Sequence, residues 1–452
     1  MPRSPTLVQS ALCAVSLAVA WSGIASPAAA AGGAFADWTF HAMARLEWAR
    51  GVSGDQKLEV VAEPSFAWRP KGARWWLHGV GRLRVDGFDR MEPGQPPPVE
   101  RSSLSRQWQL GDRADLELRE LVFEAAVGPA YLRLGKQQIV WGEADGLKLL
   151  DVVNPQDFRE FILPDFDESR IPLWAIQFEV PVGPIVAEFV WLPDPTFHDL
   201  PEPGSPFAFT SERLVGRPPA GLPVRIDPPD RPRRLLRDSD AGVRISGQFG
   251  GWDLGVAYFF HTDDTPVPAA RLEAGPAGPL LRVSPRYERD HLVGATASNA
   301  FGDLVVRSEI AWRSDRFLPT GDPAAREGET RTPELGYVLG LDWFGFTDSL
   351  VSLQVFQSWL LEDGPGRFRD TLDTNLTLLV RREFWNERLR VEAIWIHNLN
   401  DGDGVLRPKV RYELRDDWTV WAGIDVFYGR SRGLFGQFDH SDRLLVGLEW
   451  GI

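Results

Sequence analysis

The sequence predicts an all-β fold, a transmembrane antiparallel β-barrel of about 18 strands, within a range of roughly 14 to 18. Three observations predict it. Apolar and polar side chains alternate with a period of two in segment after segment, as in strands with one lipid-facing and one lumenal face. The chain has 19 Trp and 26 Phe, yet its mean hydropathy is only −0.21. Short and long connections alternate along the chain, as in barrels with short turns at one end and longer loops at the other.

The first residues, 1–31, are expected to be a cleaved signal peptide. Arg3 supplies a positive charge, an apolar run follows at 7–20, and four alanines at 28–31 offer a small-residue cleavage site. The apolar run is too short and too interrupted for a membrane-spanning helix, which needs about 20 apolar residues. The single cysteine, Cys13, lies in this segment. Residues 32–452, the expected barrel, therefore have no thiol for a disulfide, a metal site or a nucleophile.

The first expected strand covers residues 37–49. His41, Arg45 and Glu47 lie on its polar face. Its other face ends in a tryptophan at each edge and carries Trp38, Phe40, Ala42, Ala44, Leu46 and Trp48. Two tryptophans about ten residues apart on a tilted strand span roughly 25 Å, which is the height of a membrane-facing apolar band. This segment is therefore predicted to cross a membrane with its aromatic face outward.

The same alternation recurs to the end of the chain. Further strands and hairpins are predicted within residues 57–68, 75–85, 121–134, 174–191, 243–260, 293–312, 335–359, 372–395, 406–426 and 444–452. The connections after Asp86, Trp191 and Phe260 are long and rich in Pro, and they are expected to be loops. Proline does no harm there because a loop does not need its missing N–H.

Residues 141–172 break the alternation between two predicted strands and form the third long loop. Long irregular inserts in compact folds are usually functional. Asn154 and Pro155 predict the start of a short amphipathic helix that presents Phe158 and Phe161 on one face and stops at Pro164. The insert is expected to fold into the lumen and constrict it. A latch that only stiffens the barrel, or a cap over its mouth, remains the alternative.

Charge is distributed in a way that suggests a constriction. The insert carries acidic residues that include Glu143, Asp145, Asp151, Asp157, Asp165, Asp167 and Glu168, whereas the expected lumenal faces carry many basic ones. Acids facing a basic wall would set up a transverse field that sorts solutes by charge. Neighbouring charges such as Arg307 and Glu309 would alternatively neutralise each other. The predicted pore residues are Arg82, Arg84, Arg133, Gln137, Trp141, Glu143, Asp145, Asp151, Asn154, Asp157, Arg159, Arg307, Arg381, Arg407 and Arg411.

Other kinds of function find little support in the sequence. A net charge of −14 argues against a nucleic-acid partner, which requires a basic surface. The histidines at strand positions have no hydroxyl nucleophile at a recognisable motif, so no catalytic residue is assigned, although a lipid hydrolase at the barrel rim is a weak alternative. No His, Asp or Glu cluster has metal-ligand spacing, and no metal or other cofactor is predicted.

Two stretches resemble a known family. Residues 134–158, LGKQQIVWGEADGLKLLDVVNPQDF, and residues 238–267, DSDAGVRISGQFGGWDLGVAYFFHTDDTPV, are similar to a proteobacterial outer-membrane barrel family of unknown function. The resemblance rests on the signature G-[KR]-Q-x3-W-G-E-x-D-G followed by N-P-x-D. The resemblance implies a porin-like protein of the outer membrane. Members of the family often look linked to export machinery for hydrophobic compounds. The matching residues are Gly135, Gln137, Trp141, Gly142, Glu143, Asp145, Gly146, Asn154, Pro155 and Asp157.

The sequence therefore favours an outer-membrane channel, monomeric or trimeric, that passes small solutes passively. The alternative is a barrel that handles hydrophobic or lipid-like cargo for an envelope export system. The expected partners are outer-membrane lipid and lipopolysaccharide, the barrel assembly machinery and the solute or cargo itself. An open polar lumen would favour the channel, whereas an interior plugged by Phe and Trp from the insert would favour the cargo protein. The identity of the solute does not follow from the sequence.

Overall fold

The structure is a computed structural model that describes residues 37–94, 96, 99–218, 221–232, 234, 237–275, 278–322 and 324–451. The predicted signal peptide lies outside these described residues. No helix among them is long and apolar enough to span a membrane.

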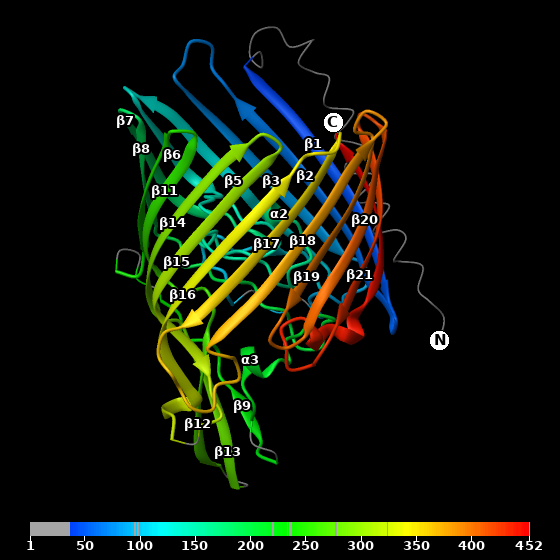
Figure 1. Ribbon diagram of the computed structural model, residues 1–452. Helices are drawn as coiled ribbons and strands as arrows, with labels where there is room; N and C mark the ends of the chain where they lie inside the picture. The colour runs from blue at the N-terminus through cyan, green and yellow to red at the C-terminus, as the bar shows by residue number, and fades with distance from the viewer. Residues whose placement is uncertain are drawn as a thin grey trace.

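Eighteen antiparallel strands form one closed barrel (Figure 1). Each strand pairs with the next along the chain, and the last strand pairs with the first, with Arg45 opposite Glu449. The predicted strand number is confirmed. The strands are β1 (Trp38–Gly51), β2 (Gly54–Trp68), β3 (Trp75–Asp86), β5 (Ala114–Val127), β6 (Ala130–Gln137), β7 (Leu173–Val182), β8 (Ile185–Leu192), β10 (Asp240–Phe249), β11 (Trp252–Thr262), β14 (Arg289–Phe301), β15 (Leu304–Pro319), β16 (Glu329–Trp343), β17 (Ser349–Leu360), β18 (Leu372–Phe384), β19 (Leu389–Asn398), β20 (Asp403–Arg415), β21 (Trp418–Tyr428) and β22 (Arg443–Gly451).

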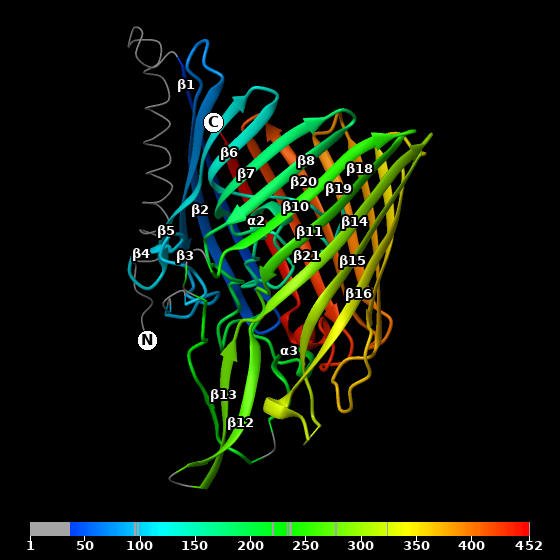
Figure 2. The same cartoon turned by 90° about the vertical axis from the view of Figure 1, so that its left-hand side faces the viewer.

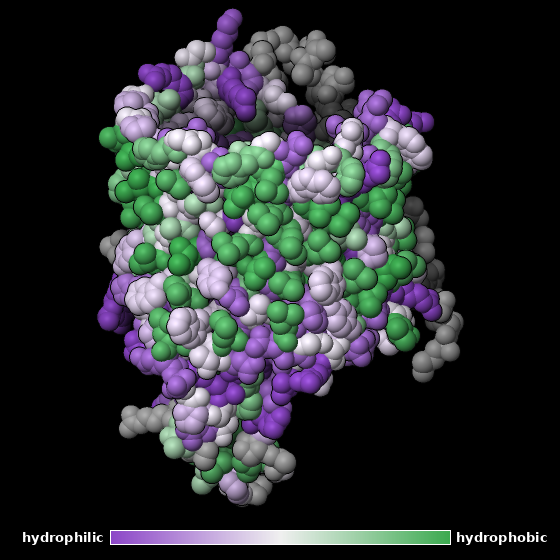
Figure 3. Space-filling model, viewed as in Figure 1, coloured by the Kyte–Doolittle hydropathy of each residue, from purple (hydrophilic) through white to green (hydrophobic). Residues whose placement is uncertain are grey.

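The outer surface of the barrel carries a broad band of apolar side chains (Figure 3). These are the residues that the alternation assigns to the outward face, and exposed examples include Phe189, Val256, Ile310, Leu339, Trp359, Val391 and Val446. Exposed large apolar side chains on this scale are costly in water and favourable against lipid tails. The barrel therefore spans a membrane through this band.

The short turns lie at one end of the barrel and the long connections at the other, as Figures 1 and 2 show. We call these the turn end and the loop end. The connection of residues 52–53 is an exception, because it is a tight turn at the loop end. Two-residue turns such as 128–129 and 250–251 need a left-handed backbone, and Gly128 and Gly250 supply it with φ of 62° and 60°.

A small second sheet projects beyond the loop end (Figure 2). It consists of β9 (Val224–Ile226), β12 (Val267–Gly275) and β13 (Gly278–Arg286). The connection after Phe260, which was expected to be a loop, therefore contains a strand pair. Pro268 lies opposite Pro285 in this hairpin, so the prolines that suggested a loop occupy a strand pair outside the barrel. The remaining short elements are β4 (Trp108–Gln109), α2 (Phe166–Ser169), α3 (Glu212–Val215) and the 3-10 turns Arg326–Gly328 and Gly436–Ser441.

The insert runs through the inside of the barrel, where Figures 1 and 2 both place α2. The helix expected from Asn154 to Pro164 is wrong, because this segment is extended or in turns, and Phe161 has a φ of 53°. Its backbone is tied elsewhere: Gln156 bridges Arg170, and Asp157 bridges Asp199. Pairing with these segments replaces the hydrogen bonds that a helix would have made within itself. The helical turn that does form, α2, comes after Pro164.

Two apolar clusters fix the insert to the inner wall. In the first, Trp141 and Leu150 pack against wall residues Val190, Phe259 and Leu292. In the second, Phe161 and Leu163 join side chains of the wall and of two loop-end connections, Phe207, Ile396, Val405, Phe427, Phe435 and Phe438. The inner wall therefore carries apolar side chains where these parts of the insert cover it.

Candidate functional site

The signature residues of the insert hold it against the wall. Asn154 Oδ1 accepts the Ile139 N–H at 2.7 Å, while its Nδ2 donates to the carbonyls of Gln137 and Ile171 at 3.2 and 2.9 Å. Both ends of the insert are thereby tied to one amide. The Trp141 indole N–H donates to Glu188 at 3.0 Å, and Gln137 and Trp141 are 1% and 2% exposed. Gln137, Trp141 and Asn154 lie in the packed contact between insert and wall.

The two stretches that carry the family resemblance meet at this contact. The Trp141 ring lies edge-on to Phe259, with ring centroids 5.5 Å apart. A Cβ on Gly242 would lie 2.6 Å from the Trp141 ring and 2.9 Å from the Tyr258 carbonyl oxygen. Gly242 is therefore a glycine because Trp141 occupies the space of its side chain. Gly294 makes room for Leu150 in the same way.

One wall carboxylate, Glu309, binds the backbone of the insert directly. It accepts the N–H groups of Glu143, Ala144 and Leu150, the last two at 2.8 and 3.2 Å. The sequence suggested that Glu309 neutralises Arg307, but Arg307 pairs with Asp145 and Asp342 instead. Sequence reasoning missed this anchoring role, since a lumenal Glu shows no pattern that identifies its partner.

Ion pairs connect the acidic residues of the insert to the basic wall. Glu160 contacts Lys57 at 2.5 Å and Arg443 at 2.6 Å, and Glu168 pairs with Arg45. Burial opposes ionisation of Glu160, but Lys57 and Arg443 outweigh it and lower its pKa below the usual range. The partners lie on three neighbouring strands, β22, β1 and β2, so these pairs hold the insert to one side of the barrel.

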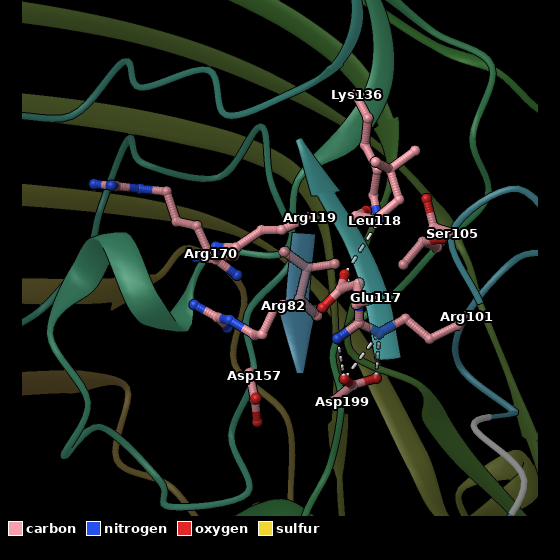
Figure 4. A network of polar contacts seen from close by, with 12 residues as sticks. Arg82, Arg101, Ser105, Glu117, Leu118, Arg119, Lys136, Asp157, Arg170 and Asp199 are labelled. Atoms are coloured by element: carbon pink, nitrogen blue, oxygen red, sulfur yellow. Dashed lines mark hydrogen bonds and ion pairs between the residues drawn. The ribbon is translucent and has the colours of Figure 1, made fainter. Parts of the chain in front are cut away.

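A second polar network ties the insert to two loop-end connections (Figure 4). Arg101 lies between Glu117 of β5 at 3.2 Å and Asp199 at 2.6 Å, and Lys136 donates to Glu117 at 3.1 Å. The Asp199 backbone in turn bonds the insert, because its carbonyl accepts the Phe158 N–H at 2.8 Å. These contacts therefore join three segments: the insert, the connection that carries Arg101 and the connection that carries Asp199.

Two cavities lie on different sides of the insert. The turn-side cavity, about 510 Å³, lies between the insert and a wall of β1–β3 and β18–β22, and it reaches Arg381, Arg411 and Glu449 near the turn end. The loop-side cavity, about 400 Å³, lies between the insert and β11 and β15–β18. Five residues line both cavities: Gly146, Ile162, Pro164, Phe166 and Ser169. The insert is therefore the partition between two lumenal spaces.

The predicted pore residues separate into groups. Eight of them line the turn-side cavity: Arg82, Arg84, Asp145, Asp157, Arg159, Arg381, Arg407 and Arg411. Asp151 and Asn154 line the loop-side cavity. Glu143 and Arg307 line a crevice of about 10 Å³ behind the insert. Arg133 pairs with Glu124 at 3.7 Å and donates to Gln177 at 3.2 Å on the inner wall.

Charge in the turn-side cavity is nearly balanced, with ten basic and eleven acidic side chains in its lining. Most are paired within the chain. Lys409 differs, because it has no ion-pair partner in the described part of the chain and lies 5.7 Å from the centre of the Trp421 ring. Asp165 and Asp167 of the insert are exposed in the same cavity. The predicted set of pore residues did not include Lys409, Asp165 and Asp167, which also line this cavity, although the sequence showed their charges.

Comparisons with solved structures identify the fold. OccK1 (OpdK) of Pseudomonas aeruginosa is 10% identical, with a TM-score of 0.51, 92% of this chain and 98% of that chain being covered. OccK2 (OpdF) of the same organism, solved in complex with glucuronate, gives the same four values. A BenF-like porin from Pseudomonas fluorescens Pf-5 is 8% identical, with a TM-score of 0.49 and coverage of 93% and 99%. The chain shares the barrel fold of outer-membrane porins.

No curated protein sequence matches the chain. The closed barrel, its apolar outer band and its charged lumen are those of an outer-membrane protein. A sequence family described as "Protein of unknown function (DUF1302)" matches residues 112–359, which include the whole insert. This match spans more than half of the 452 residues, and the chain therefore belongs to the DUF1302 family.

Proposed function

We propose that the protein is a passive outer-membrane channel for small solutes and that the insert forms its constriction. The observation that carries the proposal is the pair of lumenal cavities that share five lining residues of the insert. A solute that crosses the barrel would pass from one cavity to the other beside these residues. Lipopolysaccharide, the assembly machinery and the monomeric or trimeric state remain predictions of the sequence.

The near balance of charge in the turn-side cavity supports weak selectivity between anions and cations. We propose that the unpaired charges set its sign, because ion pairs within the wall largely cancel at a distance. Lys409 would favour anions, whereas Asp165, which has no ion pair in the described part of the chain, would favour cations; Asp167 is paired with Arg170 at 2.5 Å. The charged residues that the sequence nominated are largely paired, some between the wall and the insert, such as Arg307 with Asp145, and others within the wall, such as Arg381 with Glu392.

The test is single-channel recording of the purified protein in planar bilayers. The wild type should give stable conductance steps. Under a salt gradient, Lys409→Gln should shift the permeability ratio toward cations by roughly twofold, and Asp165→Asn should shift it toward anions. Glu413→Gln, an exposed charge near the turn end of β20, is the matched control. The absence of any steps would contradict the channel.

The cargo-handling alternative is favoured by one observation: Phe158, Phe161 and Phe166 of the insert line the loop-side cavity. A cargo-binding barrel and a channel differ in the conductance that is expected in planar bilayers. A cargo-binding barrel gives no conductance steps but retains hydrophobic molecules through purification, which mass spectrometry of the native protein detects.

A further inference from the structure

The loop-side cavity has an apolar side and a charged side. Its apolar lining comes mainly from the insert and includes Leu149, Val152, Phe158, Phe161, Phe166 and Phe356. Charged side chains of β15 and β16 and of the connection after β11 lie along the rest. A volume of about 400 Å³ is that of a small organic molecule rather than of a few waters.

The charged side of this cavity has one carboxylate in excess. Three basic residues, Lys148, Arg313 and Arg316, line it together with four acidic residues, Asp151, Asp263, Asp264 and Glu334. Lys148 pairs with Asp151 at 3.2 Å, Arg313 with Asp263 at 3.4 Å, and Arg316 with Glu334 at 3.0 Å. Asp264 has no ion pair in the described part of the chain. Partial burial and the nearby Asp240 and Asp263 raise the pKa of Asp264, which indicates a carboxylate that lacks a cation.

Two enclosed acceptors of the lining are also without a donor. His261 is 3% exposed; its Nδ1 lies 3.1 Å from the Thr262 carbonyl oxygen and donates to it, which leaves Nε2 as an acceptor. Asp151 is 5% exposed, and Lys148 and Arg170 both bind its Oδ2. Among the described residues, neither His261 Nε2 nor Asp151 Oδ1 has a hydrogen-bond partner. Enclosed acceptors without donors are costly, and a ligand that donates hydrogen bonds would satisfy them.

We infer that the loop-side cavity binds an organic cation, a molecule with an ammonium group on an apolar body. Its ammonium group would lie against Asp264, and its apolar body would lie against the phenylalanine rings of the insert, which also attract a cation to their faces. The inference rests on the proposed channel, for which this cavity would be the site where a solute is held before it passes the insert. It names the solute class that the cavity favours.

The probe is 2-phenylethylammonium, titrated by calorimetry into the full-length barrel in lipid nanodiscs. Empty nanodiscs provide the reference for partition into lipid. We expect saturable binding. Two matched compounds separate its causes: 3-phenylpropionate keeps the ring but reverses the charge, and ethylammonium keeps the charge but lacks the ring. Both should bind at least roughly tenfold more weakly, because each forfeits one of the two contacts.

Two variants test the assigned residues. Asp264→Asn, which keeps the shape of the side chain, should weaken 2-phenylethylammonium binding by roughly tenfold and leave the heat-dependent gel shift of the barrel unchanged. Asp303→Asn, in an exposed turn at the other end, should bind as the wild type does. Equal binding of 3-phenylpropionate, or unchanged binding by Asp264→Asn, would overturn the inference.

Conductance recorded on the same preparation keeps the two proposals apart. Conductance steps without saturable cation binding would overturn the site and leave the channel standing. Saturable binding that depends on Asp264, without conductance steps, would support the site and overturn the channel.

Discussion

Single side chains hold the insert to two separate parts of the barrel wall, one at β2 and β22 and the other at β15. Glu160 lies between Lys57 of β2 and Arg443 of β22, and Glu309 of β15 binds three backbone N–H groups of the insert. Enclosed charges of this kind are favourable only while each keeps its partner. The same side chains thus position the insert and make its position sensitive to the loss of any one of them.

His198 gives the structure a dependence on pH at the residue scale. Its Nδ1 accepts the N–H of Gln156 in the insert at 2.8 Å, and burial lowers its pKa to about 3. The folded state therefore prefers the neutral ring, whereas an unfolded histidine takes up a proton near pH 6.5. The stabilisation is complete above pH 6.5 and is lost as the pH falls from there toward 3.

We expect the free energy of unfolding to fall between pH 6.5 and 4.5, by up to about 1.4 kcal/mol per pH unit from this residue. Urea unfolding in lipid vesicles at several pH values measures it. His198→Gln, which keeps an acceptor for the Gln156 N–H but does not titrate, should lose part of this slope. An identical slope in the variant would contradict the assignment.

At the scale of elements, the sequence predicted the barrel well and the insert only partly. Period-two alternation assigned the outward face correctly because lipid selects apolar residues there, whatever the lumen holds. The strands that the insert covers, such as β8 and β11, carry apolar residues on both faces, for example Phe189 with Val190. That doubled apolar pattern was the available signal for where the insert packs.

The non-helical conformation of the segment after Asn154 could not have been predicted from the local sequence. Asn154 and Pro155 are good helix-starting residues, but the Asn154 side chain binds Ile139, Gln137 and Ile171 instead of capping a helix. Those partners come from the two ends of the insert, which the sequence does not place together. In the same way, the sequence nominated the signature residues Trp141 and Asn154 for the pore without showing that their side chains lie in the packed contact between insert and wall.

A glycine of the wall offers a test of the insert as an element. Gly242→Ala places a Cβ within 3 Å of Trp141, Phe259 and the Tyr258 carbonyl oxygen. We expect a loss of about 1–3 kcal/mol of stability, as in other overpacked sites, and altered conductance because the insert is displaced. Gly81→Ala is the control, since its Cβ would meet its nearest neighbours at 3.6 Å or more. Urea unfolding and single-channel recording measure both effects. Equal behaviour of the two variants would refute the packing argument.

At the scale of the whole molecule, stability depends on closure. β22 pairs with β21 on one side and with β1 on the other, so the barrel has no free strand edge. A strand edge exposed to lipid leaves backbone groups without partners, at a cost of several kcal/mol each. The small sheet at the loop end contributes no strand to this closed ring.

Removal of residues 443–451 should therefore abolish the folded barrel. Closed barrels resist SDS until they are heated, and we expect the truncated protein to lack this heat-dependent shift on gels. Replacement of the hairpin β12–β13 by a short linker is the matched control and should keep the shift, because that hairpin lies outside the ring. A heat-dependent shift in the truncated protein would contradict the requirement for closure.

The pairing of β1 with β22 also determines when the barrel can close. Met43 faces Gly451 across this pairing, so the partners lie about 400 residues apart in the chain. Until β22 has been synthesised, β1 lacks one of its two partner strands. A sheet without β22 therefore has two free strand edges, which can pair with other chains. The ring can therefore close only after the chain has been synthesised through β22.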